Sequence, residues 1–268
     1  MSDQDNIRAA AMLAPATAND IPALVRVHTA AFKSDQFSHL MLLQRPDDAH
    51  QTLMQKSIDY WFADAHAQII KAVDTDGQVV GWACWILRDA TSDLVGKTEK
   101  ADSLAALKQE ASQGSAQMTF KTPQEKLDAP IQGVTSPSGV QSTTQDPARA
   151  LGGLMGKETV KWEDKYLRGK KCLVLQALVT DPSCQGRGFG TQLIHWGTDK
   201  ADAEDLQCWA HASPSGHSLY TRAGFEEVGR SDFDLAEWAP GGKGGGRGWG
   251  NYIFRYMLRP ARYLSQST

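Results

Sequence analysis

A long apolar run that ends in a glycine-rich turn limits, more than any other feature, what this chain can fold into. The run occupies residues 172–180, Cys-Leu-Val-Leu-Gln-Ala-Leu-Val-Thr, and stops at Asp181 and Pro182. So apolar a run indicates a strand that is buried on both faces. Glycines follow at 186, 188 and 190, and residues 191–203 then carry apolar side chains at helical spacing. This order of strand, loop and helix predicts an α/β fold.

The glycine loop at 185–190 has the chemistry of an anion-binding site. Glycine adopts backbone conformations that other residues avoid, so several N–H groups can turn toward one point at the start of the helix. The positive end of the helix dipole lies at the same point. Arg187 adds a charged donor for a phosphate, and Thr191 can cap the helix or donate its hydroxyl. We expect loop and helix together to hold a pyrophosphate.

Two common phosphate loops fit this pattern poorly. A dinucleotide loop needs Gly-x-Gly-x-x-Gly early in a β-α-β unit, whereas the third glycine here comes one residue too soon and the strand lies late in the chain. A nucleotide-triphosphate loop needs Gly-x-x-x-x-Gly-Lys followed by Ser or Thr, which is absent here and from the glycine-rich stretch at 241–248. We expect that later stretch to be a flexible connector.

The remaining sequence predicts further strands and helices around this unit. Upstream, the patterns predict a strand at 7–13, a helix after the capping residues 17–20, a helix at 47–64, and two strands at 68–73 and 78–87. The turn Asp74-Thr75-Asp76-Gly77 joins those two strands as a hairpin. Downstream we expect a strand at 206–211, a short helix at 215–223 ended by Gly224, a strand from Phe225 and a last strand at 252–258.

Residues 89–164 differ in composition from both flanks. They are rich in Ser, Thr, Gln, Gly, Pro and Lys and poor in large apolar side chains, so they bury too little surface to offset the entropy of ordering the whole segment. We predict an insertion in a single domain of 1–268, helical near 101–109 and 158–167 and loose elsewhere. It is either a tolerated surface insertion, a lid over the site, or an arm that joins two copies in a homodimer.

Charge and cysteine content narrow the partners. The formal net charge is -3, so the chain lacks the basic excess that nucleic acid or an anionic membrane requires. The first residues carry acids and no apolar core segment, which argues against a secretory signal and a transit peptide. The apolar stretch at 79–87 is too short to span a bilayer as a helix. We therefore expect a cytoplasmic protein with no membrane or nucleic-acid partner. Four scattered cysteines, without metal-ligand spacing, predict reduced thiols and no metal site: Cys84, Cys172, Cys184 and Cys208.

The segment 178–190 resembles the signature of the GNAT acetyltransferases, which is Gln/Arg-x-x-Gly-x-Gly/Ala after a strand and a Pro. The segment 212–225, with Leu219-Tyr220 followed by Gly224-Phe225, is similar to the second signature of that family. The resemblance is close over 173–258 and looser over 7–88. It implies a mixed, mostly antiparallel sheet of about seven strands flanked by helices, with a splayed cofactor cleft between two central strands.

The resemblance also implies a site for acetyl-coenzyme A. The pyrophosphate is then held by Gln185, Gly186, Arg187, Gly188, Phe189, Gly190 and Thr191. The exposed main chain of Leu178, Val179 and Thr180 pairs with pantetheine as an added strand would, and one N–H there polarises the thioester carbonyl. Ser213 stands where many family members carry an Asn that contacts the cofactor.

Tyr220 matches the general acid of the family. The departing thiolate needs a proton, and a phenol with a reference pKa of about 10 can supply one at neutral pH. Its alternative role is to pack the short helix on the sheet. Because the amine attacks the thioester directly in this scheme, Cys184 is a bystander.

The sequence does not identify the base. The central strand offers Gln176 where family members often carry Glu, which leaves Asp181, His211 and His217 as open alternatives.

We predict that the acceptor is a small-molecule amine. The near-neutral surface supports this prediction. Trp82, Trp85 and Trp209 lie on predicted strands, where they could line a compact pocket, although most of them are more simply explained as core residues. Two alternatives stay open. A protein acetyltransferase acting on lysine or an α-amine would need an open peptide groove, and a non-catalytic acetyl-coenzyme A sensor would keep the loop without turnover.

Overall fold

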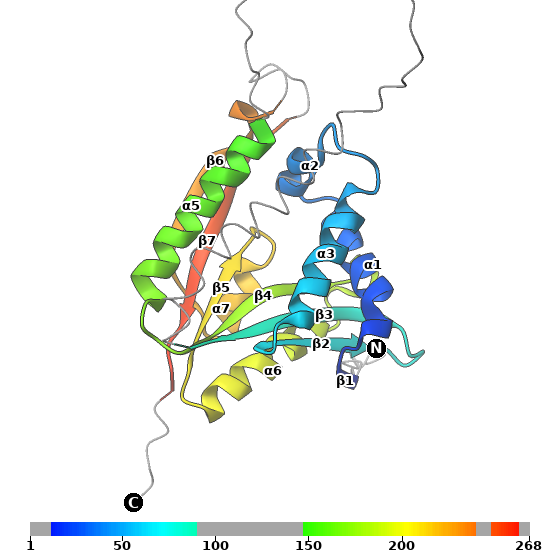
Figure 1. Cartoon of the computed structure of the whole chain (residues 1–268), viewed down its shortest axis with the longest axis vertical. Helices are drawn as coiled ribbons and strands as arrows, with labels where there is room; N and C mark the ends of the chain where they lie inside the picture. Colours follow the sequence, from blue (N-terminus) through cyan, green and yellow to red (C-terminus); the bar gives the residue numbers. More distant parts are fainter. Residues whose placement is uncertain (1–11, 90–146, 240–247, 263–268) are drawn as a thin grey trace, which may run out of the picture. The chain divides into compact units, whose positions relative to one another are not determined.

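The computed structural model of the protein describes residues 12–89, 147–239 and 248–262. They are built on a seven-stranded sheet with the order β1-β2-β3-β4-β5-β7-β6 (Figure 1). Only β4 and β5 run parallel; every other neighbouring pair is antiparallel. The strands are β1 (Met12–Pro15), β2 (Ala67–Val73), β3 (Val79–Arg88), β4 (Cys172–Thr180), β5 (Gln207–Ala212), β6 (Glu226–Asp234) and β7 (Asn251–Arg259).

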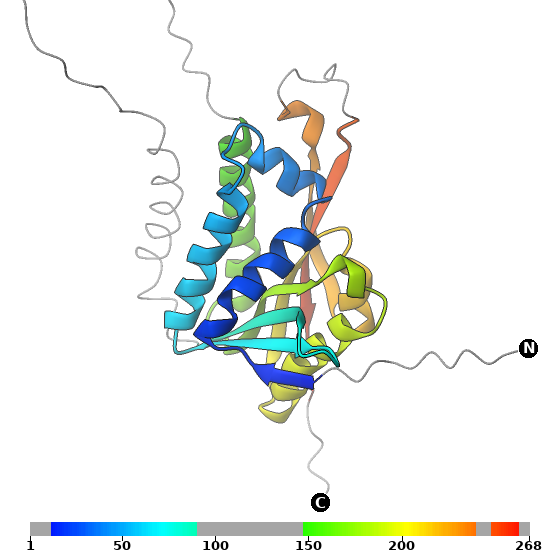
Figure 2. The ribbon, with the colours of Figure 1, turned by 90° about the vertical axis from the view of Figure 1, so that its right-hand side faces the viewer.

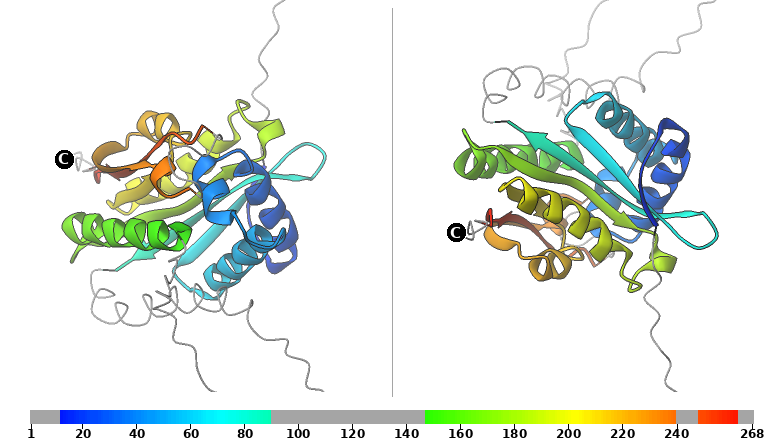
Figure 3. Two further views of the ribbon diagram at one scale, coloured as in Figure 1. Left: turned by 90° about the horizontal axis from the view of Figure 1, so that it is seen from above. Right: turned by 90° about the horizontal axis from the view of Figure 1, so that it is seen from below.

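Helices cover both faces of this sheet (Figures 2 and 3). One face carries α6 (Phe189–Ala203) and α7 (His217–Arg222), and we call it the back face. The other, the front face, carries α1 (Ile21–Ala31) and α3 (Ala49–Ala63) over β2, β3 and the end of β4, and α5 (Pro147–Leu167) over β5, β7 and β6. The short α2 (Gln36–Leu42) packs with α5 and the far ends of β6 and β7.

Strand β4 leaves its parallel neighbour half-way along. Its register with β5 runs only from Cys172 opposite Gln207 to Leu175 opposite Ala210. At that level Gln176 is an extra residue, because Trp85 and Cys84 on β3 pair with Leu175 and Ala177. Such a bulge increases the local twist and bends the strand. Beyond it, β4 keeps its ladder with β3, and no strand among the described residues pairs with it on its β5 side.

Two glycines allow helices to sit close on the sheet. A Cβ on Gly197 of α6 would lie 2.0 Å from the ring of Trp85, so α6 reaches β3 only because this position has no side chain. A Cβ on Gly229 of β6 would lie 2.3 Å from the ring of Trp162, which brings α5 against the outer strands in the same way. Close-packed contacts of this kind leave no room for even one added methyl group.

The elements predicted from the sequence are mostly confirmed, with three differences. The first strand lies at Met12–Pro15, while residues 7–11 of the prediction fall outside the described part. The helix α2 was not predicted, because Phe37, Leu40 and Leu43 pack against distant segments and make too short a pattern. The insertion boundary at 164 is wrong, since 147–164 belong to the packed helix α5, in which Leu151 is fully buried. The helix predicted at 101–109 lies outside the described residues.

Candidate active site

The free edge of β4 is the first component of the site. The N–H of Asp181 donates to the carbonyl of Val80 on β3 at 2.8 Å. Because successive residues of a strand turn their peptide groups to opposite sides, Leu178 and Thr180 turn theirs toward the space that β5 has left. The main chain of Val179 faces β3 instead, and its side chain is buried in the front-face core. Of the three residues predicted here, two offer their main chain to the cleft.

The glycine loop is the second component. It begins after the turn η3 (Pro182–Cys184), and Gly186 and Gly188 adopt φ values of +76° and +91°, which only glycine takes without strain. Gly188 is the residue before α6, and its carbonyl accepts a hydrogen bond from the N–H of Gln192 at 3.0 Å. The amides of Phe189, Gly190 and Thr191 precede the first helical hydrogen bond and point out of the helix end, where the dipole is positive.

Gly190 joins three components of the site. A Cβ at this position would lie 3.4 Å from the hydroxyl oxygen of Thr180 at the end of β4 and 3.2 Å from the side chain of Leu219 on α7. The open strand edge, the helix N-terminus and α7 therefore meet within van der Waals contact. A Cβ at position 190 would require the Leu219 side chain to shift by a few tenths of an ångström.

The side chains of the loop divide into exposed donors and a buried anchor. Gln185 and Arg187 are exposed, and the amide of Gln185 donates to the carbonyl of Thr180 at 3.3 Å. The guanidinium of Arg187 lies 5.2 Å from the ring centroid of Phe189, which is only 1% exposed. Phe189 thus contributes its main chain to the cleft and its ring to the core. Cys184 is buried beside them, where Arg187 contacts its sulfur at 3.7 Å.

Tyr220 and Ser213 both border Gly216, the residue before α7. The ring of Tyr220 is buried against Phe225, and among the described residues its hydroxyl has no hydrogen-bond partner. Burial raises the pKa of Tyr220 above its usual value, so the phenol keeps its proton throughout the neutral range. A Cβ on Gly216 would lie 3.6 Å from this hydroxyl and 3.7 Å from the hydroxyl of Ser213. Ser213 itself contacts Ser215 at 3.0 Å.

A sequence model of a family described as "Acetyltransferase (GNAT) domain" matches residues 149–227. That range contains the free edge of β4, the glycine loop and α7, and extends back through most of α5. The chain carries a GNAT domain. No curated protein sequence matches the chain.

Solved structures share the fold of this GNAT domain at low sequence identity. An arylalkylamine N-acetyltransferase 2 from Aedes aegypti is 12% identical with a TM-score of 0.59, covering 94% of this chain and 100% of its own. A polyamine N-acetyltransferase from Drosophila melanogaster is 11% identical with a TM-score of 0.54, covering 93% and 99%. A protein from Corynebacterium glutamicum described as a histone acetyltransferase HPA2 and related acetyltransferase is 17% identical with a TM-score of 0.51, covering 95% and 98%. These likenesses confirm the fold.

Two of the proposed bases have structural partners in this GNAT domain. Asp181 accepts from the N–H and the hydroxyl of Ser183 and pairs with Arg26 at 3.0 Å. The Ser183 hydrogen bonds, more than the Arg26 charge, lower the pKa of Asp181 despite partial desolvation. A carboxylate held in this way caps a turn and is a weak proton acceptor. His217 lies on the back face, with its Nε2 3.7 Å from Glu227.

His211 lies in a different setting, on the front face. It follows Ala210, the last residue of β5 in register with β4, and its side chain is 24% exposed. Its Nε2 is 3.4 Å from Oε1 of Glu163 on α5, and Arg88 at the end of β3 donates to the other oxygen of Glu163 at 2.8 Å. Glu163 was missed in the sequence because it falls inside the segment that we had assigned to the insertion.

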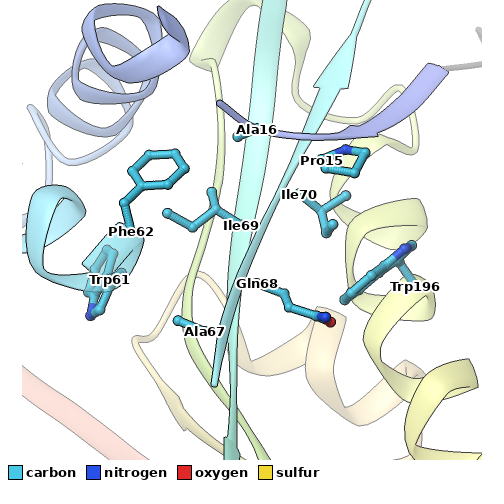
Figure 4. Close-up of a pocket in the computed structure, with 9 residues that line it drawn as sticks. All are labelled: Pro15, Ala16, Trp61, Phe62, Ala67, Gln68, Ile69, Ile70 and Trp196. Carbon is cyan, nitrogen blue, oxygen red and sulfur yellow. The ribbon is translucent and has the colours of Figure 1, made fainter. Parts of the chain in front are cut away.

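The tryptophans expected to line a pocket are buried in the core. Trp82, Trp85 and Trp209 are all 0% exposed, so the simpler of their two interpretations, a place in the core, is confirmed, and the aromatic-lined pocket is not formed by them. A hollow of about 270 Å³ does have aromatic walls, but it lies at the outer edge of β2, where Trp61 and Phe62 lie on one side and Trp196 on the other (Figure 4). It is lined by no residue of β4, β5 or α7, and we do not assign it to the reaction.

A smaller hollow adjoins the glycine loop. It measures about 140 Å³ between α6 and α7 and is lined by Thr191, Ile194, His195, Leu219, Arg222 and Ala223. Arg222 is therefore a second cation beside the loop, and the helical spacing of Leu219 and Arg222 in the signature could have indicated it. Within the described ranges no group of three His, Cys, Asp or Glu side chains could hold a metal ion, and no helix there is long and apolar enough to cross a membrane.

Proposed function

We propose that this protein transfers an acetyl group from acetyl-coenzyme A to a primary amine of a small molecule. The observation that carries the proposal is the meeting, at Gly190, of an unpaired strand edge, a helix N-terminus and α7. Acetyl-coenzyme A has a matching sequence of groups: a diphosphate, then a pantetheine with two amides, then a thioester.

Each part of the cosubstrate has a partner in this arrangement. The diphosphate fits the free amides of Phe189, Gly190 and Thr191, with Arg187 as the charged donor. The pantetheine amides can extend the sheet along the peptide groups of Leu178 and Thr180. The nucleotide end would reach the hollow beside Arg222. Ser213, which like Tyr220 borders Gly216, would contact the thioester end.

The chemistry needs a proton donor at the thioester sulfur. The attacking amine forms a bond to the carbonyl carbon, the C–S bond breaks, and the sulfur leaves as a thiolate. Tyr220 holds a proton at neutral pH and its hydroxyl has no other acceptor among the described residues, so we assign it the role of general acid. An N–H of the free β4 edge would polarise the carbonyl.

A small amine is favoured as the acceptor over a protein. Structures that share the fold at a TM-score above 0.5 include an arylalkylamine N-acetyltransferase and a polyamine N-acetyltransferase. The helix α2 and the start of β7 also contact each other across the front face, since Tyr252 donates to Asp35 at 3.1 Å. A peptide acceptor requires an open groove, and we expect this contact to limit such a groove at the front of the site.

The test is release of free thiol from acetyl-coenzyme A across panels of small amines and of peptides. We expect turnover with at least one amine and a loss of about 100-fold in kcat for Tyr220→Phe, with unchanged affinity for acetyl-coenzyme A. Tyr60→Phe is the matched control, because Tyr60 is an exposed residue of α3. Turnover with peptides alone would contradict the acceptor class, and binding without any turnover would favour a sensor.

A further inference from the structure

We propose that His211 accepts the proton that the acceptor ammonium loses before it attacks, with Glu163 and Arg88 as positioning residues. This inference rests on the proposed function and concerns its missing base. Three elements that are distant in the sequence supply the residues: β3 supplies Arg88, α5 supplies Glu163 and β5 supplies His211.

The position of His211 in the sheet is the first argument. β4 and β5 separate directly after the Leu175 and Ala210 pair, and His211 is the next residue of β5. Across the opening, the extra residue Gln176 of β4 is exposed. The thioester has to lie where the two strands part, because the free peptide groups begin there. A proton acceptor for the attacking amine has to be close to the same point.

The second argument is that Glu163 is held as an anion at a partly buried position. Its side chain is 17% exposed. Burial by itself would raise its pKa, but the contact with His211 and the charge and hydrogen bond of Arg88 outweigh burial and lower the pKa to about 2. A fixed negative charge 3.4 Å from the imidazole stabilises the ring when it gains a proton.

The Nε2 atom of His211 has a partner in either neutral tautomer of the ring. The indole Nε1 of Trp209 donates to Nε2 of His211 at 2.9 Å, and the same Nε2 faces Glu163. An unprotonated Nε2 accepts from Trp209, and a protonated Nε2 donates to Glu163. In the second state Nδ1, which has no hydrogen-bond partner among the described residues, carries the lone pair that receives the new proton.

Aromatic side chains fix the orientation of the ring. Phe254 lies 5.6 Å from it, and Trp209 and Tyr256 lie edge-on at 5.9 and 5.6 Å. Burial raises the pKa of Tyr256, so it stays neutral near pH 7. From α5 the facing charges are Glu163 and, nearer to Tyr256, Glu158 and Lys161; from β3 the facing charge is Arg88. Of the groups facing the ring, none but Glu163 is both anionic and in contact with it.

The reaction needs no reactant besides the amine and acetyl-coenzyme A. Nδ1 of His211 takes one proton from the ammonium, and the freed amine pair forms the N–C bond. The C–S pair leaves on sulfur and takes the proton of Tyr220. The second proton of the attacking nitrogen restores Tyr220, and His211 releases its proton to solvent through its exposed edge. The products are the amide, coenzyme A and one proton.

The test compares His211→Gln, Glu163→Gln and the control His66→Gln, which alters an exposed histidine in the turn before β2. With the best amine of the panel we expect His211→Gln to lower kcat/KM about 100-fold near pH 7. The deficit should shrink at higher pH, where the amine is already unprotonated. Glu163→Gln should lower the rate less and move the acid limb of the pH profile to lower pH, because the protonated ring loses its counter-charge. Affinity for acetyl-coenzyme A should stay near the parent value, whereas Glu163→Gln should lower the melting temperature, because it removes the charge that pairs with Arg88.

Several results would overturn the proposal. One is a pH profile of His211→Gln parallel to that of the parent, whatever its height, because a structural or substrate-binding role lowers the rate equally at every pH. Another is an unchanged acid limb in Glu163→Gln, which shows the same even if His211→Gln folds poorly. If the parent releases no thiol with any amine, the proposed function fails as well. If the parent is active while both variants match it, only the assignment of the base fails.

Discussion

The back and front faces of this sheet differ in how their parts are distributed along the sequence. The back face, with the proposed cofactor cleft, comes from one continuous stretch in which β4, the glycine loop, α6, β5 and α7 follow each other. The front face combines α1, α2, α3 and α5 with residues from β3, β5 and β7. In our proposal a local motif holds the cosubstrate, whereas the wall that faces the acceptor is assembled from segments that are distant in the sequence.

The largest expected effect concerns the packing of α6. In Gly197→Ala the new methyl group would meet the rigid ring of Trp85 at 2.0 Å, so the helix must move off the sheet. We expect the free energy of unfolding to fall by about 3 kcal/mol in denaturant titrations. The control is Gly153→Ala on α5, where nothing lies within 4 Å and alanine should stabilise the helix by up to about 1 kcal/mol. Equal behaviour of the two variants would show that α6 is not packed as described.

The next prediction distinguishes a specific role of the glycine loop in coenzyme A binding from the general effect of backbone strain. Gly188 and Gly77 both have positive φ, +91° and +77°, and nothing lies near either position, so alanine strains both to a similar degree. We expect Gly188→Ala to weaken coenzyme A binding about 30-fold, because the amides at the start of α6 turn away from the diphosphate. Gly77→Ala, in the hairpin between β2 and β3, should leave the affinity unchanged in calorimetric titrations. Equal affinities in both variants would remove the loop from the cofactor site.

What could be read from the sequence follows the same division. The glycine loop, Tyr220 and the strands around them were predicted because their spacing is local and turn residues mark their limits. Glu163 and α2 were not predicted, because their contacts lie with residues that are distant in the chain: His211 and Arg88 for Glu163, and Tyr252 for α2. For the tryptophans the sequence leaves two positions open, because an aromatic residue on a strand gives the same pattern whether its side chain faces a pocket or the core.

A smaller effect is expected from the exposed cation of the loop. Arg187 is exposed and, within the described ranges, interacts with Phe189 and Cys184, so its removal should disturb the fold little. Arg187→Gln should weaken the binding of coenzyme A about 10-fold. It should not change the binding of pantetheine analogues that lack the diphosphate. The loss should diminish as salt is raised, since salt screens exposed charges. Equal losses for ligands with and without the diphosphate would place Arg187 elsewhere on the cofactor.

The smallest effect is a pH dependence that belongs to the front face. Nδ1 of His28 on α1 lies 3.1 Å from Nε2 of His50 on α3, and burial, with the neighbouring His50, lowers the pKa of His28 to about 3. The unfolded chain therefore binds a proton near pH 6.5 that the folded chain refuses, and stability falls as pH drops from 6.5 toward 3. We expect a loss of about 1 kcal/mol between pH 6.5 and 5.5, most of which disappears in His28→Gln. A slope unchanged by that substitution would assign the acid sensitivity to other groups.

The central claim is that the free edge of β4 and the first turn of α6 together bind coenzyme A. Amide hydrogen exchange, followed with and without coenzyme A, tests it at the residues concerned. The account predicts slower exchange at Leu178, Thr180 and the amides of 186–191, with no change in β1 or around the hollow at Trp61. No binding, or protection at that hollow with unchanged exchange in β4 and the loop, would contradict it.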